Sequence, residues 1–128
     1  MNQTIPEELQ YSTSHEWVRT ERDGTVTVGV TDYAQSQLGD VVFVELPRVG
    51  KHYVVGGAAA VLESVKAAAD VYAPLTGDVL AVNEQLSQDP GLLNRDPYGE
   101  GWLFRLHPVS NGATELMDAT TYATLIHP

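Results

Sequence analysis

Lys66 is the residue of this chain best placed to carry a chemical group. Residues 61–66 alternate with the two-residue period of a strand, and strand character returns at Val71 and Tyr72 after three alanines. The two strands and the small residues between them predict a hairpin that holds the Lys66 amine out from the protein body. An exposed ε-amine is a target for acylation, and an acylated lysine is the uncharged root of a flexible arm. From composition alone, an ordinary solvated lysine is the simpler interpretation.

The other reactive residue types predict no catalytic residues and no metal site. Ser14, His15 and Glu16 have the residue types of a catalytic triad. Because neighbours on a strand point to opposite faces, they cannot form a chain of nucleophile, base and orienting acid. Segment 99–101 lacks the full dinucleotide or phosphate-loop pattern. The histidines have no metal-ligand spacing, so we expect solvated or singly hydrogen-bonded rings at His15, His52, His107 and His127.

The lysine turn belongs to a series of short predicted strands. Asp23-Gly24 predicts a hairpin turn between the first two, and Gly and Pro residues separate most of the later ones. Because residues 41–46 are apolar on both faces, we expect that strand to be central in the core. The pattern predicts a mainly β fold, a small flattened barrel or sandwich of antiparallel sheets. The expected strands are residues 11–20, 25–30, 41–46, 51–55, 58–65, 68–73, 78–82 and 102–106.

Short helices complete the expected fold. Thr31 can cap a helix over residues 31–38, and Gly39 occupies the favoured position just beyond its end. The pair Asp89-Pro90 predicts one helical turn. Apolar side chains at three- and four-residue spacing predict a C-terminal helical segment over residues 116–126, laid against the sheets.

The composition is that of a soluble globular protein, with 43% hydrophobic and 19% charged residues. A length of 128 residues suits a single domain over residues 1–128. Its polar first segment, residues 1–10, is expected to be an extended lead-in. Cysteine is absent, which excludes a disulfide framework, a thiol nucleophile and a cysteine metal site.

The net charge of −10 narrows the possible partners. Nucleic acid and anionic membrane surfaces require basic patches, so we expect neither as a partner. The acidity favours steering toward basic docking faces of other proteins, and it also serves solubility. Residues 1–8 lack the pattern of a signal peptide or organelle presequence, and no apolar run approaches membrane-spanning length. We therefore expect a monomeric protein of the bacterial cytoplasm, with a processed mitochondrial protein as the alternative.

Six blocks of the chain share a pattern with a known family. In chain order they are His15-Glu16-Trp17-Val18, Val28-Gly29-Val30-Thr31-Asp32-Tyr33-Ala34-Gln35, residues 38–47, Glu63-Ser64-Val65-Lys66-Ala67-Ala68 followed by Asp70, Tyr72-Ala73-Pro74 and residues 96–103. These blocks resemble the H protein family of the glycine cleavage system, whose members carry lipoate, and the resemblance covers roughly residues 11–126. Ala69 stands where the family usually has Ser, which removes a possible turn hydroxyl and leaves the acceptor lysine.

The resemblance implies a non-catalytic carrier with lipoate attached covalently to Lys66, and it implies that Glu63 helps a lipoylating enzyme recognise the segment. It implies three further partners. A glycine decarboxylase (P protein) loads an aminomethyl group onto the arm, an aminomethyltransferase (T protein) removes the methylene, and dihydrolipoamide dehydrogenase (L protein) reoxidises the dithiol. A carrier also suits a chain without active-site machinery, because group-carrying cofactors hold the reactive atoms themselves.

A loaded aminomethyl arm needs a protonated amine, because a free nitrogen lone pair can expel the thiolate. A nearby carboxylate favours the charged form and raises the pKa of an amine. From their places in the matching blocks, we expect Glu16 and Asp70, with Ser14 at the rim, to receive this ammonium. The alternative is that both acids are ordinary solvated charges.

Three other functions remain open from the sequence. A biotinyl domain or a lipoyl domain of a 2-oxoacid dehydrogenase could share the hairpin, although biotin domains favour methionines beside the lysine, where this chain has Val65 and Ala67. An H-like protein that donates lipoyl groups to other lipoyl domains would look nearly the same. A hydrolase would need catalytic residues that the pattern does not supply.

Overall fold

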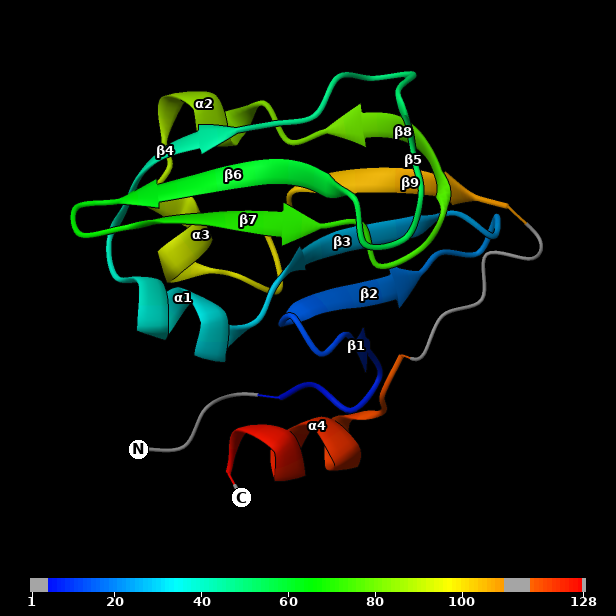
Figure 1. Cartoon of the computed structure of the whole chain (residues 1–128), viewed down its shortest axis with the longest axis horizontal. Helices are drawn as coiled ribbons and strands as arrows, with labels where there is room; N and C mark the ends of the chain where they lie inside the picture. The colour runs from blue at the N-terminus through cyan, green and yellow to red at the C-terminus, as the bar shows by residue number, and fades with distance from the viewer. Residues whose placement is uncertain (1–4, 110–115, 128) are drawn as a thin grey trace.

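The computed structural model of the chain, which describes residues 5–109 and 116–127, consists of two antiparallel sheets and short helices (Figure 1). The first sheet has the strand order β1-β2-β3-β9-β8-β5, and the second has the order β4-β6-β7. The mainly β, antiparallel fold predicted from the sequence is confirmed. The strands are β1 Gln10–Tyr11, β2 Glu16–Thr20, β3 Val26–Val30, β4 Val41–Glu45, β5 His52–Tyr53, β6 Ala58–Ser64, β7 Ala68–Tyr72, β8 Gly77–Val82 and β9 Phe104–Pro108.

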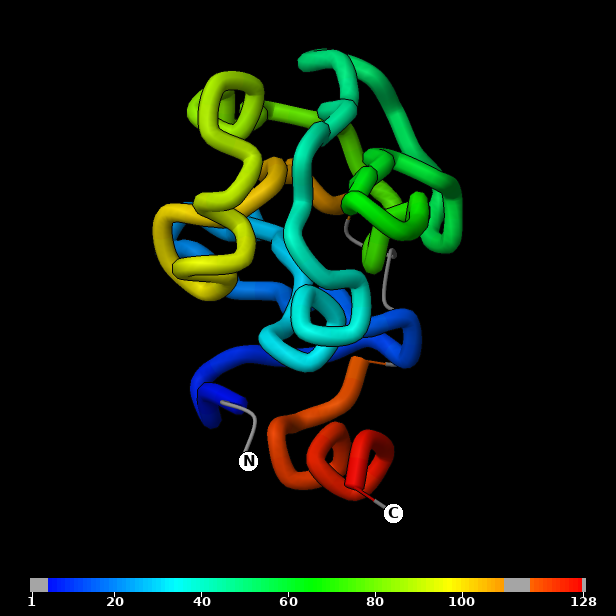
Figure 2. The backbone as a smooth tube through the Cα atoms, turned by 90° about the vertical axis from the view of Figure 1, so that its left-hand side faces the viewer, coloured from blue at the N-terminus to red at the C-terminus, as the bar shows by residue number. Residues whose placement is uncertain are grey.

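The three-stranded sheet lies over one face of the six-stranded sheet, and the main core fills the space between them (Figures 1 and 2). Val28, Phe104 and Leu106 contribute from the six-stranded sheet, while Leu62 and Val71 contribute from the smaller one. All five side chains are buried, so the alternating apolar residues of each strand meet across the interior. This packing fixes the lysine hairpin, β6–β7, to a rigid base.

A second apolar cluster joins the C-terminal helix, α4 Ala119–Ile126, to the first strands. Tyr122 stacks on Tyr11 with ring centroids 4.6 Å apart. Trp17 is fully buried, and its indole Nε1 donates to the carbonyl of Pro97 at 2.9 Å. Both Figure 1 and Figure 2 place α4 below the two sheets, on the side of β1. These aromatic residues therefore form the core of the second cluster.

The helices follow their sequence signals closely. Helix α1 Asp32–Leu38 is capped by the Thr31 hydroxyl, which accepts from the Ala34 N–H at 3.1 Å, and it ends at Gly39 with φ +87°. Helix α3 Leu92–Arg95 follows the predicted Asp-Pro turn, whereas α2 Gln85–Gln88 was not predicted. Helix α4 begins later than expected because Met117 pairs with β1 as an isolated bridge. No helix in the described ranges is long and apolar enough to cross a membrane.

The prediction that residues 41–46 form a central strand is wrong. Strand β4 is an edge of the three-stranded sheet, and the side chains of Val42 and Phe43 are 54% and 51% exposed. A bulge between Val41 and Phe43 changes the register against β6 and turns two consecutive side chains outward. Apolar residues on both faces therefore did not mean that both faces were covered.

Two predictions about the first residues also need correction. The expected strand over residues 11–20 is divided into β1 and β2 by a turn, in which His15 adopts φ +73°. Within the described part of the lead-in, Glu7 and Glu8 form a turn and Leu9 is buried in the second cluster, so this segment is not extended. Residues 1–4 lie outside the described residues. Packing against α4, which no local pattern reveals, explains both differences.

Candidate functional site

Lys66 lies exposed in the turn of the β6–β7 hairpin, as the sequence predicted. The Ser64 hydroxyl organises this turn, because it accepts from the N–H groups of Lys66 at 3.2 Å and Ala67 at 3.1 Å. Across the turn, the Ser64 N–H donates to the Ala67 carbonyl at 2.8 Å. The small residues predicted the turn, but the role of this hydroxyl was not predicted, although serine is a common source of such turn bonds.

The loop after α1 supports the hairpin from one side. The Val65 N–H donates to the carbonyl of Asp40 at 3.3 Å. A side chain added at Gly39 would lie 3.5 Å from Cε of Lys66, so the lysine stem passes over the end of α1. Glu63, the predicted recognition residue, is exposed on β6 and pairs with Ala68 across the hairpin. The amine is therefore presented on a braced backbone next to α1.

A cavity of about 330 Å³ opens between α1, the turn before β2 and the inner edge of the β6–β7 hairpin. It brings together the three acid-pocket residues that were predicted from the resemblance, namely Ser14, Glu16 and Asp70. The wall made by α1 was not predicted from the sequence, although the helix lies within the matching blocks and carries apolar residues, Ala34 and Leu38, that pack against the core. The lining residues contributed by α1 and the hairpin are Tyr33, Ala34, Gln37, Leu38, Leu62, Ala69, Asp70 and Val71.

Glu16 is the most buried acid of the cavity, with 1% of the residue exposed. Its Oε1 accepts from the hydroxyls of Ser12 at 2.5 Å and Ser14 at 2.6 Å, and its Oε2 accepts from the Tyr72 N–H at 3.0 Å. Burial raises the pKa of Glu16, and these hydrogen bonds oppose the shift by stabilising the carboxylate. No basic side chain in the described ranges forms an ion pair with Glu16. Hydrogen bonds alone, and no cation of the described residues, therefore stabilise its carboxylate.

Asp70 and Ser14 occupy different positions around this carboxylate. Asp70 is exposed on β7 opposite Val61 and borders the cavity from the hairpin. Ser14 lies at the rim and is committed to Glu16 by its hydroxyl. Ser12, which the sequence argument did not identify, makes a second such bond and also accepts from the Glu16 N–H at 3.0 Å. A seryl turn thus holds Glu16 in place, and Asp70 borders the same cavity from the other sheet.

The triad is absent from this segment for a reason other than the one predicted. The three residues do not lie on one strand, because Ser14 and His15 belong to the turn. The Ser14 hydroxyl donates to Glu16, and Nδ1 of His15 lies 2.8 Å from the Tyr122 hydroxyl. The Ser14 hydroxyl is directed to Glu16 and not to His15, so the segment lacks the link between nucleophile and base.

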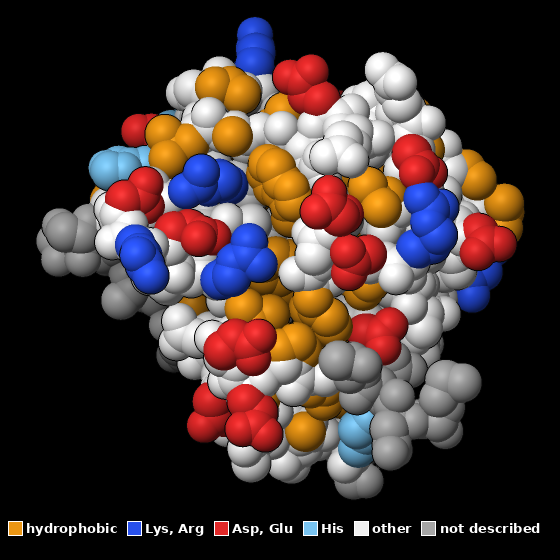
Figure 3. Space-filling view, turned by 180° about the vertical axis from the view of Figure 1, so that it is seen from behind, with side chains coloured by type: hydrophobic (Ala, Val, Ile, Leu, Met, Phe, Trp, Pro, Cys, Tyr) orange, Lys and Arg blue, Asp and Glu red, His pale blue; other side chains and the backbone are white. Residues whose placement is uncertain are grey.

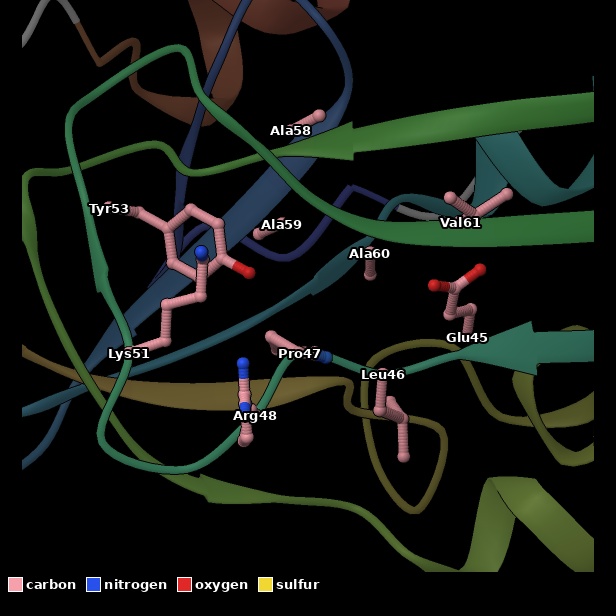
Figure 4. A pocket seen from close by; sticks show the side chains of 10 residues that line it. All are labelled: Glu45, Leu46, Pro47, Arg48, Lys51, Tyr53, Ala58, Ala59, Ala60 and Val61. Carbon is pink, nitrogen blue, oxygen red and sulfur yellow. The ribbon is translucent and has the colours of Figure 1, made fainter.

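A second hollow, of about 320 Å³, lies at the end of β6 far from Lys66 (Figure 4). Glu45, Arg48 and Lys51 line it, and Nζ of Lys51 lies 5.5 Å from the ring centre of Tyr53. None of the predicted site residues borders it. The hollow is open and carries both signs of charge, so it offers no distinct ligand chemistry.

Comparisons with known proteins agree in fold and sequence. A family model described as Glycine cleavage H-protein matches residues 9–128. A protein named Glycine cleavage system H protein from a Psychrobacter species is 62% identical over 104 residues, which is 81% of this chain and 82% of that protein. One of the same name from Alkalilimnicola ehrlichii is 52% identical over 123 residues, 95% of each chain. The crystal structure of a glycine cleavage system H protein from Mycobacterium marinum aligns with a TM-score of 0.89 and 38% identity, covering 97% of this chain and 100% of that one.

Proposed function

The chain belongs to the glycine cleavage H-protein family, and on this premise we propose that it is a lipoyl carrier with lipoate in amide linkage to Lys66. The observation that supports this most directly is the position of Lys66, exposed in a braced turn beside a cavity with an acidic end. An isolated surface lysine would need neither the turn nor the cavity. The carrier itself is not an enzyme in this proposal, because its partners supply the catalytic groups.

The chemistry of the cavity lining suits the proposed arm. Leu38, Leu62 and Val71 give it an apolar wall suited to a hydrocarbon chain and sulfur atoms, while Glu16 and Asp70 supply negative charge. When attached, the lipoyl group supplies a disulfide that accepts an aminomethyl group. The chain's own residues hold the ammonium of that cargo: Glu16 and Asp70 stabilise the charge, and Ser14, at the rim, holds Glu16 in place. Holding the amine protonated protects the cargo between partners.

The partners of this carrier are proposed from the same premise. Glycine decarboxylase loads the arm, the aminomethyltransferase unloads it, and dihydrolipoamide dehydrogenase reoxidises it, all in the bacterial cytoplasm. Glu63 is exposed on the strand that leads to Lys66, which supports the proposal that the lipoylating enzyme recognises it. Acylation of Lys66 would remove one positive charge from a chain of net charge −10. The resulting acidic monomer would be drawn to basic docking faces on its partners.

Intact mass tests the attachment site. The wild-type chain and Lys66→Arg are each expressed with lipoate in a host that lipoylates proteins. We expect one lipoyl increment on the wild type and none on Lys66→Arg, which keeps the charge of the lysine but offers no acylatable amine. An unmodified wild type would contradict the proposal, and a product that binds avidin would point to biotin.

The lifetime of the aminomethyl-loaded form tests the acidic pocket. In Glu16→Gln and Asp70→Asn we expect the half-life at neutral pH to fall by about tenfold, because each unit by which the amine pKa falls raises its free fraction about tenfold. Glu21→Gln, just beyond the far end of β2, is the matched control and should behave like the wild type. Half-lives that remain at the wild-type value in both pocket variants would refute the pocket but leave the attachment intact.

A further inference from the structure

Tyr122 lies in the C-terminal helix, far from Lys66 in sequence, yet its hydroxyl reaches two residues that hold the cavity. It is 2.8 Å from Nδ1 of His15 and 2.7 Å from Oγ1 of Thr31. His15 lines the cavity in the turn that carries Glu16, and Thr31 caps α1, the opposite wall. Tyr122 does not line the cavity. One buried hydroxyl therefore joins two walls of the site from outside it.

The connection continues directly into the cavity lining. The Thr31 hydroxyl accepts from the Ala34 N–H at 3.1 Å, and Ala34 lines the cavity from the first turn of α1. The Thr31 N–H donates to the carbonyl of His15 at 3.1 Å, so the two residues also share a backbone bond. The ring of His15 contacts that of Tyr33, another lining residue, with centroids 5.0 Å apart. A shift of the Tyr122 hydroxyl would move both walls.

The available protons and acceptors give a direction to this series of hydrogen bonds. The oxygen of Thr31 already accepts from Ala34, and its own proton can be donated to Tyr122, whose proton then goes to Nδ1 of His15. This arrangement satisfies each hydroxyl and requires a neutral His15 with its proton on Nε2. Burial lowers the pKa of His15 and raises the pKa of Tyr122, and both shifts favour these neutral forms.

The ring of Tyr122 is held independently of its hydroxyl. It stacks on Tyr11 with an interplanar angle of 9°, and Met117, just before α4, exchanges backbone hydrogen bonds with Tyr11 at 2.8 and 2.7 Å. The hydroxyl thus projects from a fixed ring, as a positioning group requires. This separates the two roles of the residue: the ring attaches α4, and the hydroxyl positions the cavity walls.

We propose that Tyr122 is a positioning residue of the arm pocket, through which the C-terminal helix sets the spacing between α1 and the turn that bears Glu16. This proposal rests on the proposed function, since the pocket matters only if it receives the arm. It assigns to α4 a part in protecting the cargo, in addition to closing the second apolar cluster. The residue acts through His15 and Thr31 and touches no cargo itself.

The test compares Tyr122→Phe with Tyr11→Phe. Each variant removes one buried hydroxyl from the same ring stack, but the Tyr11 hydroxyl donates to the Pro6 carbonyl at 2.5 Å, away from the cavity. In the unlipoylated protein, NMR should show a raised His15 pKa and faster exchange of the Ala34 amide for Tyr122→Phe alone, because neutral His15 and the α1 cap lose a partner. In the loaded protein, its half-life should fall about threefold to tenfold, whereas Tyr11→Phe should match the wild type.

The outcomes separate this proposal from the one it rests on. Equal half-lives in Tyr122→Phe and Tyr11→Phe would overturn the positioning role and leave the carrier function standing. A wild-type protein that protects its cargo no better than free aminomethyl-lipoamide in solution would overturn the pocket, and the role of Tyr122 with it. The urea denaturation midpoints of both variants show whether a shorter half-life results only from a less stable fold.

Discussion

The two ends of β2 each hold a glutamate that accepts hydrogen bonds from hydroxyl groups, but the pKa values of the two glutamates are shifted in opposite directions. At one end, Glu16 accepts from two serine hydroxyls, and burial raises its pKa. Just beyond the other end, Glu21 accepts from the Thr27 hydroxyl at 2.6 Å and from Arg19 at 3.1 Å, and these contacts lower its pKa. Both carboxylates are held by hydroxyl donors. The difference lies in burial and in whether a cation of the same chain is present.

That difference separates the Glu21 group, which is structural, from the Glu16 cavity, which is the candidate site. Arg19 lies beside Glu21 and Arg105 lies 3.9 Å from Asp23, so the surface acids meet cations of their own chain. Figure 3 shows acidic and basic side chains interleaved on the back of the molecule. Around Glu16, by contrast, no ion pair forms within the described residues. A buried carboxylate without an internal cation favours a cation brought from outside, such as the ammonium of the proposed cargo.

The largest expected effect is on stability. Glu16→Ala leaves two serine hydroxyls and the Tyr72 N–H without an acceptor, so we expect the free energy of unfolding to fall by about 2–4 kcal/mol. Glu21→Ala removes a partly exposed ion pair and the acceptor of one buried hydroxyl, that of Thr27, so it should cost less, about 1–2 kcal/mol. Urea denaturation at neutral pH measures both. Equal losses in the two variants would show that Glu16 and Glu21 contribute equally to stability and would contradict the comparison.

A cation supplied by the protein should make the surroundings of Glu16 resemble those of Glu21. Gln37 lies exposed on α1 at the cavity, and Gln37→Lys would place an amine near Glu16. We expect the Glu16 pKa to fall and the half-life of the loaded form to shorten by about threefold to tenfold, because the internal amine competes for the carboxylate. Ser36→Lys, exposed on the same helix but not lining the cavity, is the control. An effect of the same size there would indicate a general charge effect.

The pH dependence of stability should have opposite signs at the two ends of β2. Because the folded pKa of Glu16 lies above its ordinary value of 4.5, its contribution is present below about pH 4.5 and is lost as the pH rises through the folded pKa. Glu21 has a lowered pKa, so its contribution is present at neutral pH and is lost as the pH falls. Urea titrations of wild type, Glu16→Gln and Glu21→Gln between about pH 3 and pH 8 measure the two slopes, and slopes of equal sign would contradict the comparison.

The smallest effect is expected at Arg19. Its side chain is 41% exposed, so Arg19→Gln should lower the free energy of unfolding by a few tenths of a kcal/mol, and less in high salt. The half-life of the loaded form should not change. A loss above about 1 kcal/mol would show that Arg19 contributes more to stability than a screened ion pair with Glu21.

Local patterns determined much of this protein. Two-residue alternation and small residues predicted the β6–β7 hairpin and the exposure of Lys66, and Thr31 and Gly39 marked both ends of α1. These features depend on neighbours within a few residues, so a single sequence contains the needed information. The roles of Lys66, Glu16 and Asp70 came from family resemblance, which local physics does not supply.

Only the tertiary structure decided how these parts meet. Burial gave Glu16 its raised pKa, and Ser12 became its second hydroxyl donor because a turn interrupts the predicted strand. The exposure of Phe43 followed from its edge strand, and the contact between His15 and Tyr122 joins residues 107 positions apart. Periodicity states which side chains share a face, but the neighbour that covers the face, and the desolvation it imposes, depends on segments packed from elsewhere in the chain.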